Sequence, residues 1–212
     1  ILHEIKETGH ITADDIGTVA FACIDASIVP VDENCDPIDN CIIWMDSRTG
    51  DQAARLQKAI SEQEALEITG SPFTPFQDVT KIMWFRENRP EIYRRARYFC
   101  EATSFFVGHL TGTPVNGYCG ASYTQLFDIR TKRWSETVFQ AAELDMDKMF
   151  EVKSGYEIAG TVRPERAEEF GLSSRTRVVV GDSDHQIAML GSGMSQPGQV
   201  MDISGTSTSI ST

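Results

Sequence analysis

The stretch RVVVGDSDHQIAMLG, residues 177–191, decides the fold class of this chain. Its first residues form a β-branched apolar run that predicts a buried strand, and Gly181 ends that strand. A helix rich in small residues is predicted from about His185 to Gly193, followed by a strand over residues 199–203. Because buried strands that alternate with helices are typical of α/β proteins, we expect an α/β fold with functional side chains at the strand ends.

Local signals extend the same alternation toward the N-terminus. Strands are predicted over residues 19–23 and 27–31, and helices over 49–60, 62–70, 78–88 and from residue 90 onward. Ser61 and Glu64 form a capping box at the start of the second of these helices, and Asp78 is the expected cap of the third. The first residues have the pattern of the last turns of a helix, so we expect further chain before Ile1.

Charge and composition argue against several classes of function. The formal net charge of −12 over 212 residues, without a basic run, argues against nucleic acid or an anionic membrane surface as a partner. All apolar runs are far shorter than the roughly 20 residues that span a bilayer. The five cysteines are scattered without a CxxC pair, and the four histidines lack metal-ligand spacing. We therefore expect a cytoplasmic protein with reduced thiols and neither a disulfide framework nor a zinc site.

Asp184 is a candidate for chemistry because it follows a predicted strand and begins a predicted helix. The positive end of the helix dipole keeps a carboxylate at such a junction ionised. An ionised carboxylate held by rigid elements can take a proton from a hydroxyl group as a general base. The alternative is that Asp184 or Ser183 only caps the helix, and these residues alone leave both interpretations open.

Two further segments combine polar side chains with strand ends. Residues 202–209, Asp-Ile-Ser-Gly-Thr-Ser-Thr-Ser, offer backbone amides and hydroxyls for phosphate oxygens, although a hairpin turn explains the same composition. In residues 42–49, Trp44 stands close to Asp46 and Arg48. That arrangement fits a platform for a sugar ring, or a core tryptophan beside a surface ion pair.

In order and spacing, these segments resemble the FGGY family of carbohydrate kinases, which includes xylulokinase, glycerol kinase and gluconokinase. The matching motifs are W-x-D-x-R-[TA] at 44–49, K-L-x-W … P-E-I-Y at 81–93, L-F-D-x-x-x-x-x-W at 126–134, G-G-G-D-[QN] or G-D-Q-Q at 181–185, and x-P-G-x … G-T-S at 196–207. The resemblance covers nearly the whole chain, and the combination is specific although each motif alone is weak.

The resemblance implies an actin-like (RNase H-like) ATPase fold in which sugar and ATP lie between two domains. Residues 1–198 would be the sugar-binding N-terminal domain without its opening hairpin, and 199–212 the start of the nucleotide-binding domain. The D-x-G-T phosphate loop of the family and its C-terminal domain would lie outside the chain, so this piece alone would be inactive.

The resemblance also implies roles for individual residues. These are Asp184 as the general base, Asp25, Ala26, Trp44, Phe76, Asp184 and His185 around the sugar, and Gly205, Thr206 and Ser207 facing the ATP phosphates. The implied cofactors are ATP and Mg²⁺, with no metal ligand assigned to the chain itself. The implied partners are a sugar or polyol and ATP, and a homodimer is a candidate assembly.

At one place the chain departs from the family. Relatives carry sugar-contacting pairs such as Met-His or Arg-Glu after the strand around Val19, whereas Asp25 and Ala26 stand here. An acid and a small residue should change which hydroxyls are recognised, so pentuloses, glycerol-like polyols and hexonates remain open as substrates. A non-catalytic sugar-binding homologue also remains open.

A third interpretation takes Gly181-Asp182-Ser183 as the Gly-Asp-Ser segment of an ester hydrolase, with Ser183 as the nucleophile. No Asp-x-x-His follows Ser183 to complete a triad. Asp182 falls on a glycine of the kinase motif and has no assigned chemistry.

Overall fold

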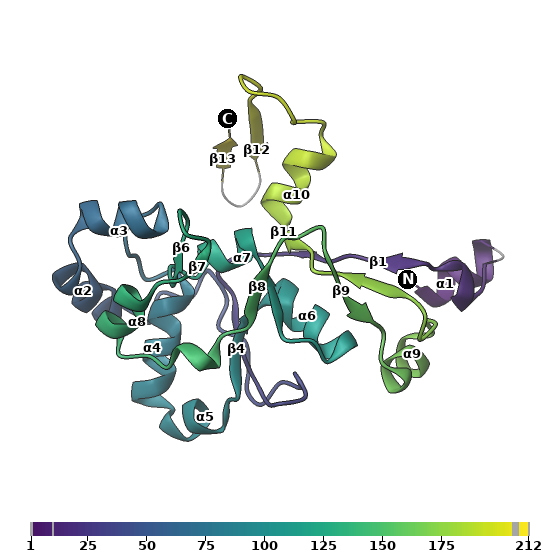
Figure 1. Ribbon diagram of the computed structural model, residues 1–212, viewed down its shortest axis with the longest axis horizontal. Coiled ribbons are helices and arrows are strands. Elements are labelled where there is room, and N and C mark those ends of the chain that lie inside the picture. Colours follow the sequence, from purple (N-terminus) through teal and green to yellow (C-terminus); the bar gives the residue numbers. More distant parts are fainter. Residues whose placement is uncertain (1, 10, 205–207, 212) are drawn as a thin grey trace.

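The computed structural model describes residues 2–9, 11–204 and 208–211 and confirms an α/β fold (Figure 1). The helices are α1 (Leu2–Gly9), α2 (Gly50–Ala59), α3 (Glu62–Thr69), α4 (Asp78–Asn88), α5 (Pro90–Arg95), α6 (Ala102–Thr111), α7 (Tyr118–Tyr123), α8 (Glu136–Ala142), α9 (Pro164–Phe170) and α10 (Asp184–Gly191). The strands are β1 (Thr18–Val19), β2 (Ala22–Cys23), β3 (Ile28–Val31), β4 (Tyr98–Glu101), β5 (Val115–Gly117), β6 (Phe127–Asp128), β7 (Arg133–Trp134), β8 (Glu151–Lys153), β9 (Ile158–Thr161), β10 (Arg177–Val179), β11 (Asp182–Ser183), β12 (Met201–Ser204) and β13 (Thr208–Ser211).

Two parallel strand pairs position the residues of interest. β1 runs parallel to β10, and β2 runs parallel to β11 with Ala22 opposite Asp182. Because parallel strands end at the same edge of a sheet, the residues that follow β2 and β11 come together there. The strand predicted over residues 19–23 is thus present as two short strands, and the strand predicted before Gly181 is β10.

Two glycines allow these strands to approach closely. Gly181 joins β10 to β11 with a φ of +71°, and a Cβ atom there would lie 2.6 Å from the carbonyl oxygen of Phe21. A Cβ atom on Gly117, at the end of β5, would lie 2.6 Å from the carbonyl oxygen of Gly181. Only glycine fits such contacts, so β5 and the β10–β11 turn are locked together beside the β1–β2 segment.

A hydrophobic core lies between α2, α4, α5 and α8 and supports the antiparallel β3–β4 pair. Its buried members include Leu56, Phe85, Phe99 and Phe139. A second core lies under α6 and α9 and contains Val178 of β10. The strands that carry the pocket are therefore held by packing on two sides.

Of the two helix starts predicted from capping residues, the Ser61 cap is confirmed and the Asp78 cap is wrong. Ser61 is the N-cap of α3, and its side chain accepts the backbone N–H of Glu64. Asp78 is not a cap, because Gln77 occupies the N-cap position of α4 and Asp78 is the first helical residue. The Asp78 carboxylate instead turns inward, where Oδ1 lies 3.3 Å from Nζ of Lys81 and both side chains are fully buried. A buried cation has drawn the carboxylate away from the helix end.

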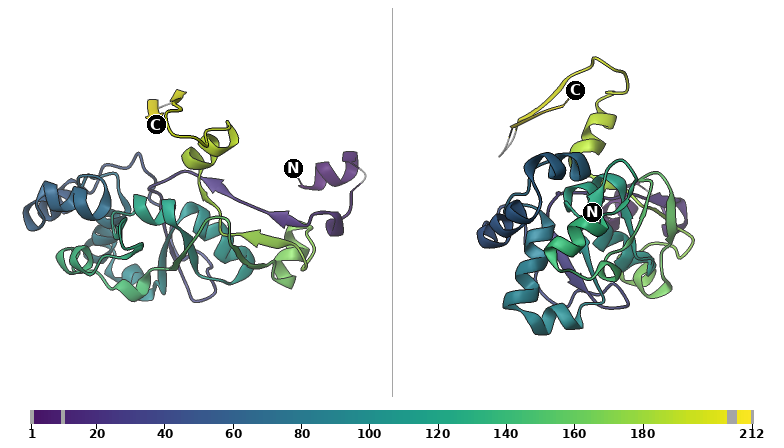
Figure 2. Two further views of the ribbon diagram at one scale, coloured as in Figure 1. Left: turned by 45° about the horizontal axis from the view of Figure 1, so that its top comes forward. Right: turned by 60° about the vertical axis from the view of Figure 1, so that its left-hand side comes forward.

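Helix α10 and the antiparallel β12–β13 hairpin project from the rest of the chain (Figure 2). None of the described residues of α10 is buried. The observed bounds of α10 and β12 lie close to the bounds predicted for this helix and this strand. Of the helices described here, none is long and apolar enough to cross a membrane.

Candidate active site

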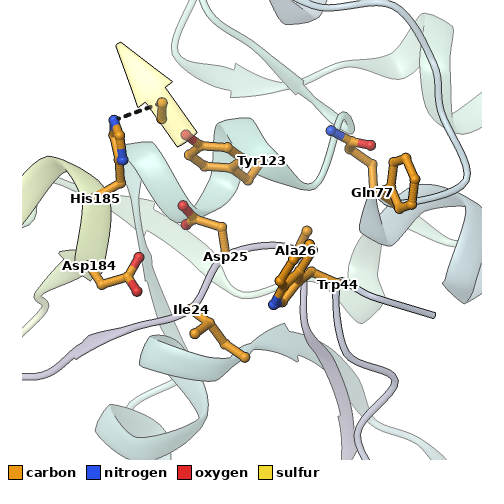
Figure 3. A pocket seen from close by; sticks show the side chains of 10 residues that line it. Ile24, Asp25, Ala26, Trp44, Gln77, Tyr123, Asp184 and His185 are labelled. Carbon is orange, nitrogen blue, oxygen red and sulfur yellow. Dashed lines mark hydrogen bonds between the residues drawn. The ribbon is translucent and has the colours of Figure 1, made fainter. Parts of the chain in front are cut away.

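A pocket of about 540 Å³ opens where β2 and β11 end (Figure 3). It is lined by Ile24, Asp25 and Ala26 after β2, by Trp44, by Phe76 and Gln77 before α4, by Tyr123 of α7, by Asp184 and His185 of α10, and by Ser209 of β13. The structure thus brings together all six residues that the resemblance places around the sugar, although up to 160 positions separate them (185 − 25).

Asp184 is the first residue of α10, and its exposed side chain lies on the wall of the pocket. Ser183 holds the N-cap position, but its side chain makes no capping hydrogen bond. Neither residue therefore caps the helix through its side chain, which was the alternative to a chemical role. The carboxylate stands at the positive end of the helix dipole, within reach of a ligand.

Asp25 lies at the centre of the pocket, between the α10 side chains and Trp44 (Figure 3). Burial raises the pKa of Asp25 to about 8, and the charges of Glu101 and Asp184 add to the rise. The nearby Ser183 hydroxyl opposes it, yet neither that hydroxyl nor Asp25 Oδ1 completes a hydrogen bond with any described residue. Asp25 therefore holds a proton at neutral pH and keeps an unused acceptor.

The buried Lys81 side chain links two segments that line the pocket. Its ammonium group donates to the carbonyl oxygens of Ala26 and Phe76, the latter at 2.6 Å, and pairs with Asp78. Ala26 has a φ of +49°, a left-handed conformation that is unfavourable for alanine and that the Lys81 contact holds in place. No sequence pattern predicts this role of Lys81, because two of its three partners are backbone carbonyl groups.

The Trp44 segment combines parts of both interpretations, a surface ion pair and an aromatic side chain in the pocket. Arg48 pairs with Asp46 and lies 4.7 Å from the ring centre of Trp84, so the predicted surface ion pair exists. Trp44 itself is half-buried and lines the pocket, together with the exposed ring of Phe76. Aromatic faces beside a few polar groups are typical of small-molecule sites.

Other residues of the site escaped prediction. Ile24, Gln77 and Tyr123 line the pocket without a predicted role, and Ser209, the last residue of the predicted phosphate segment, lines it as well. Tyr123 connects the pocket to α10, because its hydroxyl accepts a hydrogen bond of 3.2 Å from Gln186. No pattern in the sequence indicates that Tyr123 lies beside the pocket.

The Gly-Asp-Ser segment has a structural explanation. Asp182 is buried, and its Oδ1 accepts the backbone N–H groups of Gly120 at 2.9 Å and Ser183 at 3.2 Å. Ser183 is 1% exposed, so its hydroxyl is out of reach of an ester substrate. This burial argues against the hydrolase interpretation and gives Asp182 a role in packing.

The predicted phosphate segment is described only in part. Gly205, Thr206 and Ser207 lie outside the described residues. The hairpin on either side of them adjoins the pocket, since Ser209 lines it and Nε2 of His185 lies 2.7 Å from the Ser211 hydroxyl. Within the described ranges, no three His, Cys, Asp or Glu side chains gather into a cluster that could hold a metal ion.

Comparison with known proteins decides the family. The profile described as "FGGY family of carbohydrate kinases, N-terminal domain" matches residues 1–191. This chain belongs to the FGGY family of carbohydrate kinases. The match agrees with the motifs found in the sequence, while the domain boundary after residue 198 stays a prediction.

Curated relatives of this FGGY chain include kinases for different small molecules. It is 30% identical over 191 residues to a xylulose kinase of Lactococcus lactis, covering 90% of this chain and 37% of that protein. It is 27% identical over 197 residues to a gluconokinase of Bacillus subtilis, covering 93% and 38%. An autoinducer-2 kinase of Enterobacter is 28% identical over 208 residues, covering 97% and 39%. The chain therefore spans about two fifths of these relatives.

Solved structures confirm the actin-like fold. A xylulose kinase from Rhodospirillum rubrum superimposes with a TM-score of 0.91 at 22% identity, covering 99% of this FGGY chain and 43% of that one. A Plasmodium falciparum glycerol kinase solved with ADP gives a TM-score of 0.82 at 22% identity, with 99% and 43% covered.

Proposed function

We propose that this chain supplies the sugar-binding part of an ATP-dependent kinase that phosphorylates a hydroxyl group of a sugar or polyol. The observation that carries the proposal is Asp184, an accessible carboxylate at a helix N-terminus on the wall of a pocket that Trp44 and Phe76 also line. Membership of the FGGY family supports the reaction class. A cytoplasmic location and a homodimer remain predictions.

In the proposed reaction, Asp184 accepts the proton of the substrate hydroxyl as its oxygen attacks the γ-phosphorus of ATP. The new O–P bond forms as the bond to ADP breaks, and the proton stays on the carboxylate until it exchanges with water. Gly205, Thr206 and Ser207 are the proposed contacts of the ATP phosphates. Mg²⁺ is proposed to enter with the nucleotide, and no step is assigned to a metal held by the described residues. Most of the rate enhancement would come from positioning of the two substrates.

The test is formation of ADP by the full-length protein with a panel of sugars and polyols, followed by the Asp184→Asn variant. We expect kcat to fall by roughly 10²–10⁴, the usual contribution of a general base. Because Asp184 makes no capping bond, folding should lose less than about 1 kcal/mol. Asp51→Asn is the matched control, since Asp51 is an exposed residue in the first turn of α2 and lies outside the pocket.

Full activity in Asp184→Asn would exclude Asp184 as the base. The acid at Asp25 favours one other candidate, a homologue that binds sugar without phosphorylating it. Saturable sugar binding by the unmodified protein with no sugar-dependent ADP would support that candidate and contradict the kinase.

A further inference from the structure

The charge of the pocket restricts what it can bind. Its described lining contains two carboxyl groups, those of Asp25 and Asp184, and neither lysine nor arginine. The three residues between β12 and β13 that lie outside the description are glycine, threonine and serine, which add no charge. A ligand that carries a negative charge would therefore find no lysine or arginine to pair with among the described lining residues, where His185 is the one other basic side chain.

Nearby cationic side chains are already engaged. Lys81 is fully buried beneath the pocket, and its charge is paired with Asp78. Arg48 is paired with Asp46, at 2.7 Å, and lies over an aromatic ring outside the pocket. The ring nitrogen Nε2 of His185 lies 2.7 Å from a β13 hydroxyl. Neither Lys81 nor Arg48 therefore supplies a free positive charge to a ligand.

The raised pKa of Asp25 indicates that a negative charge is unfavourable in this pocket. Desolvation, helped by the neighbouring acids, raises its pKa to about 8. A carboxylate brought in by a ligand would lose the same water and meet the same acids. The groups that keep Asp25 protonated therefore also oppose a bound sugar acid.

We infer that this pocket binds an uncharged sugar or polyol, selects against sugar acids, and uses Asp25 to recognise a substrate hydroxyl. The inference rests on the proposed function of the pocket. Asp25 is half-buried in the lining, and its carboxyl group can accept a hydrogen bond from a substrate hydroxyl, which an ionised carboxylate group of a ligand cannot donate. The relatives include gluconokinases and xylulose kinases, so similarity alone leaves the choice open. The negative charge of the pocket favours an uncharged sugar or polyol over a sugar acid.

Matched ligand pairs test this directly. Glycerol and glycerate, ribitol and ribonate, and glucitol and gluconate differ only in whether one terminal carbon is a CH₂OH or a carboxylate group. Isothermal titration of the full-length protein at pH 7.5 should give the alcohol of the preferred pair a Kd at least ~100-fold below that of the acid. An acid that binds as tightly as its alcohol overturns the inference, as does the absence of binding by every member of the panel.

A variant that adds a cation sharpens the test. Ile24 lines the pocket and is 42% exposed, so Ile24→Arg can be accommodated without breaking the core. It should narrow the preference for the alcohol by about tenfold or more. Ile158→Arg is the matched control, because Ile158 is 46% exposed on β9, outside the lining, and should leave the preference unchanged. If Ile24→Arg leaves the preference unchanged, or Ile158→Arg narrows it equally, charge in the pocket is not its cause.

Phosphorylation of the same panel separates this inference from the proposed function. Preferential binding of alcohols without phosphorylation by ATP would leave the inference standing and refute the kinase. Phosphorylation of gluconate in preference to glucitol would refute the inference and leave the kinase standing.

Discussion

Replacing Lys81 by methionine tests how much the buried Lys81 contacts stabilise the segments that line the pocket. The side chain is fully buried, and its ammonium group contacts two carbonyl oxygens and Asp78. Methionine is close to lysine in length but supplies neither the charge nor the donors. The Lys81→Met variant therefore leaves Asp78 as a lone buried carboxyl group and deprives the carbonyls of Ala26 and Phe76 of a partner.

The size of the effect follows from these three partners. Burial raises the pKa of Asp78 to about 6 even beside Lys81, which costs about 3 kcal/mol relative to an unfolded value near 3.9. Without Lys81 the group is protonated, which costs about 4 kcal/mol at pH 7, so the net change at Asp78 is about 1 kcal/mol. Each carbonyl that loses a charged donor adds about 1–2 kcal/mol. We expect a loss of about 3–5 kcal/mol in the free energy of unfolding, the usual range for a broken buried pair.

The loss should also depend on pH. Above pH 6 the unmodified protein keeps Asp78 ionised, whereas the variant must bind a proton that the unfolded chain does not hold. The difference in stability should therefore widen by about 1.4 kcal/mol for each pH unit above 6. Adding Asp78→Asn to Lys81→Met should abolish that widening, since no titrating group remains.

Urea unfolding followed by circular dichroism at pH 6, 7 and 8 measures both effects. Lys148→Met is a matched control, because Lys148 donates to the carbonyl of Ala96 at 2.6 Å but is half-buried over the ring of Tyr93. It should cost about 1 kcal/mol at every pH. A loss below about 1 kcal/mol in Lys81→Met at pH 7, or an unchanged pH slope after Asp78→Asn is added, would refute the reasoning.

Two further predictions concern buried acids. Asp182→Asn should cost about 1–3 kcal/mol in urea unfolding, because the amide keeps one acceptor oxygen for the Gly120 and Ser183 N–H groups but puts an NH₂ donor in place of the second oxygen of a buried carboxyl group; an unchanged midpoint would contradict its packing role. The stability of the unmodified chain should decline from about pH 4 to about pH 8, because burial raises the pKa of Glu101 to about 7 and of Asp25 to about 8, so the folded state binds protons more tightly than the unfolded state. Asp25→Asn should flatten the decline between pH 7 and 8, and an unaltered curve would exclude Asp25 as its source.

Local patterns predicted what depends on neighbours in the chain. The strand–glycine–helix pattern placed Asp184 at a junction, and the predicted cap at Ser61 marked the start of α3. Asp78 was wrongly predicted as a cap, because the pattern of a helix start does not reveal a buried lysine one turn later.

Long-range features left no comparable trace. Tyr123 reaches the pocket only because α7 packs against β11, and Lys81 acts through backbone groups at residues 26 and 76. Asp182 looked neutral in the motif, yet it is buried where β11 meets α7. Such contacts depend on the tertiary arrangement, which composition and periodicity do not encode.

The position of Trp44 has a practical consequence. The chain has three tryptophans, and Trp44 lines the pocket. Trp84 lies against Arg48 and the core, and the indole N–H of Trp134 donates to the carbonyl of Phe150 at 2.9 Å. A bound molecule would thus alter the surroundings of Trp44, while the fluorescence of the two other tryptophans stays constant. The Trp44→Phe variant would show that constant fluorescence by itself. The chain carries its own optical sensor of pocket occupancy.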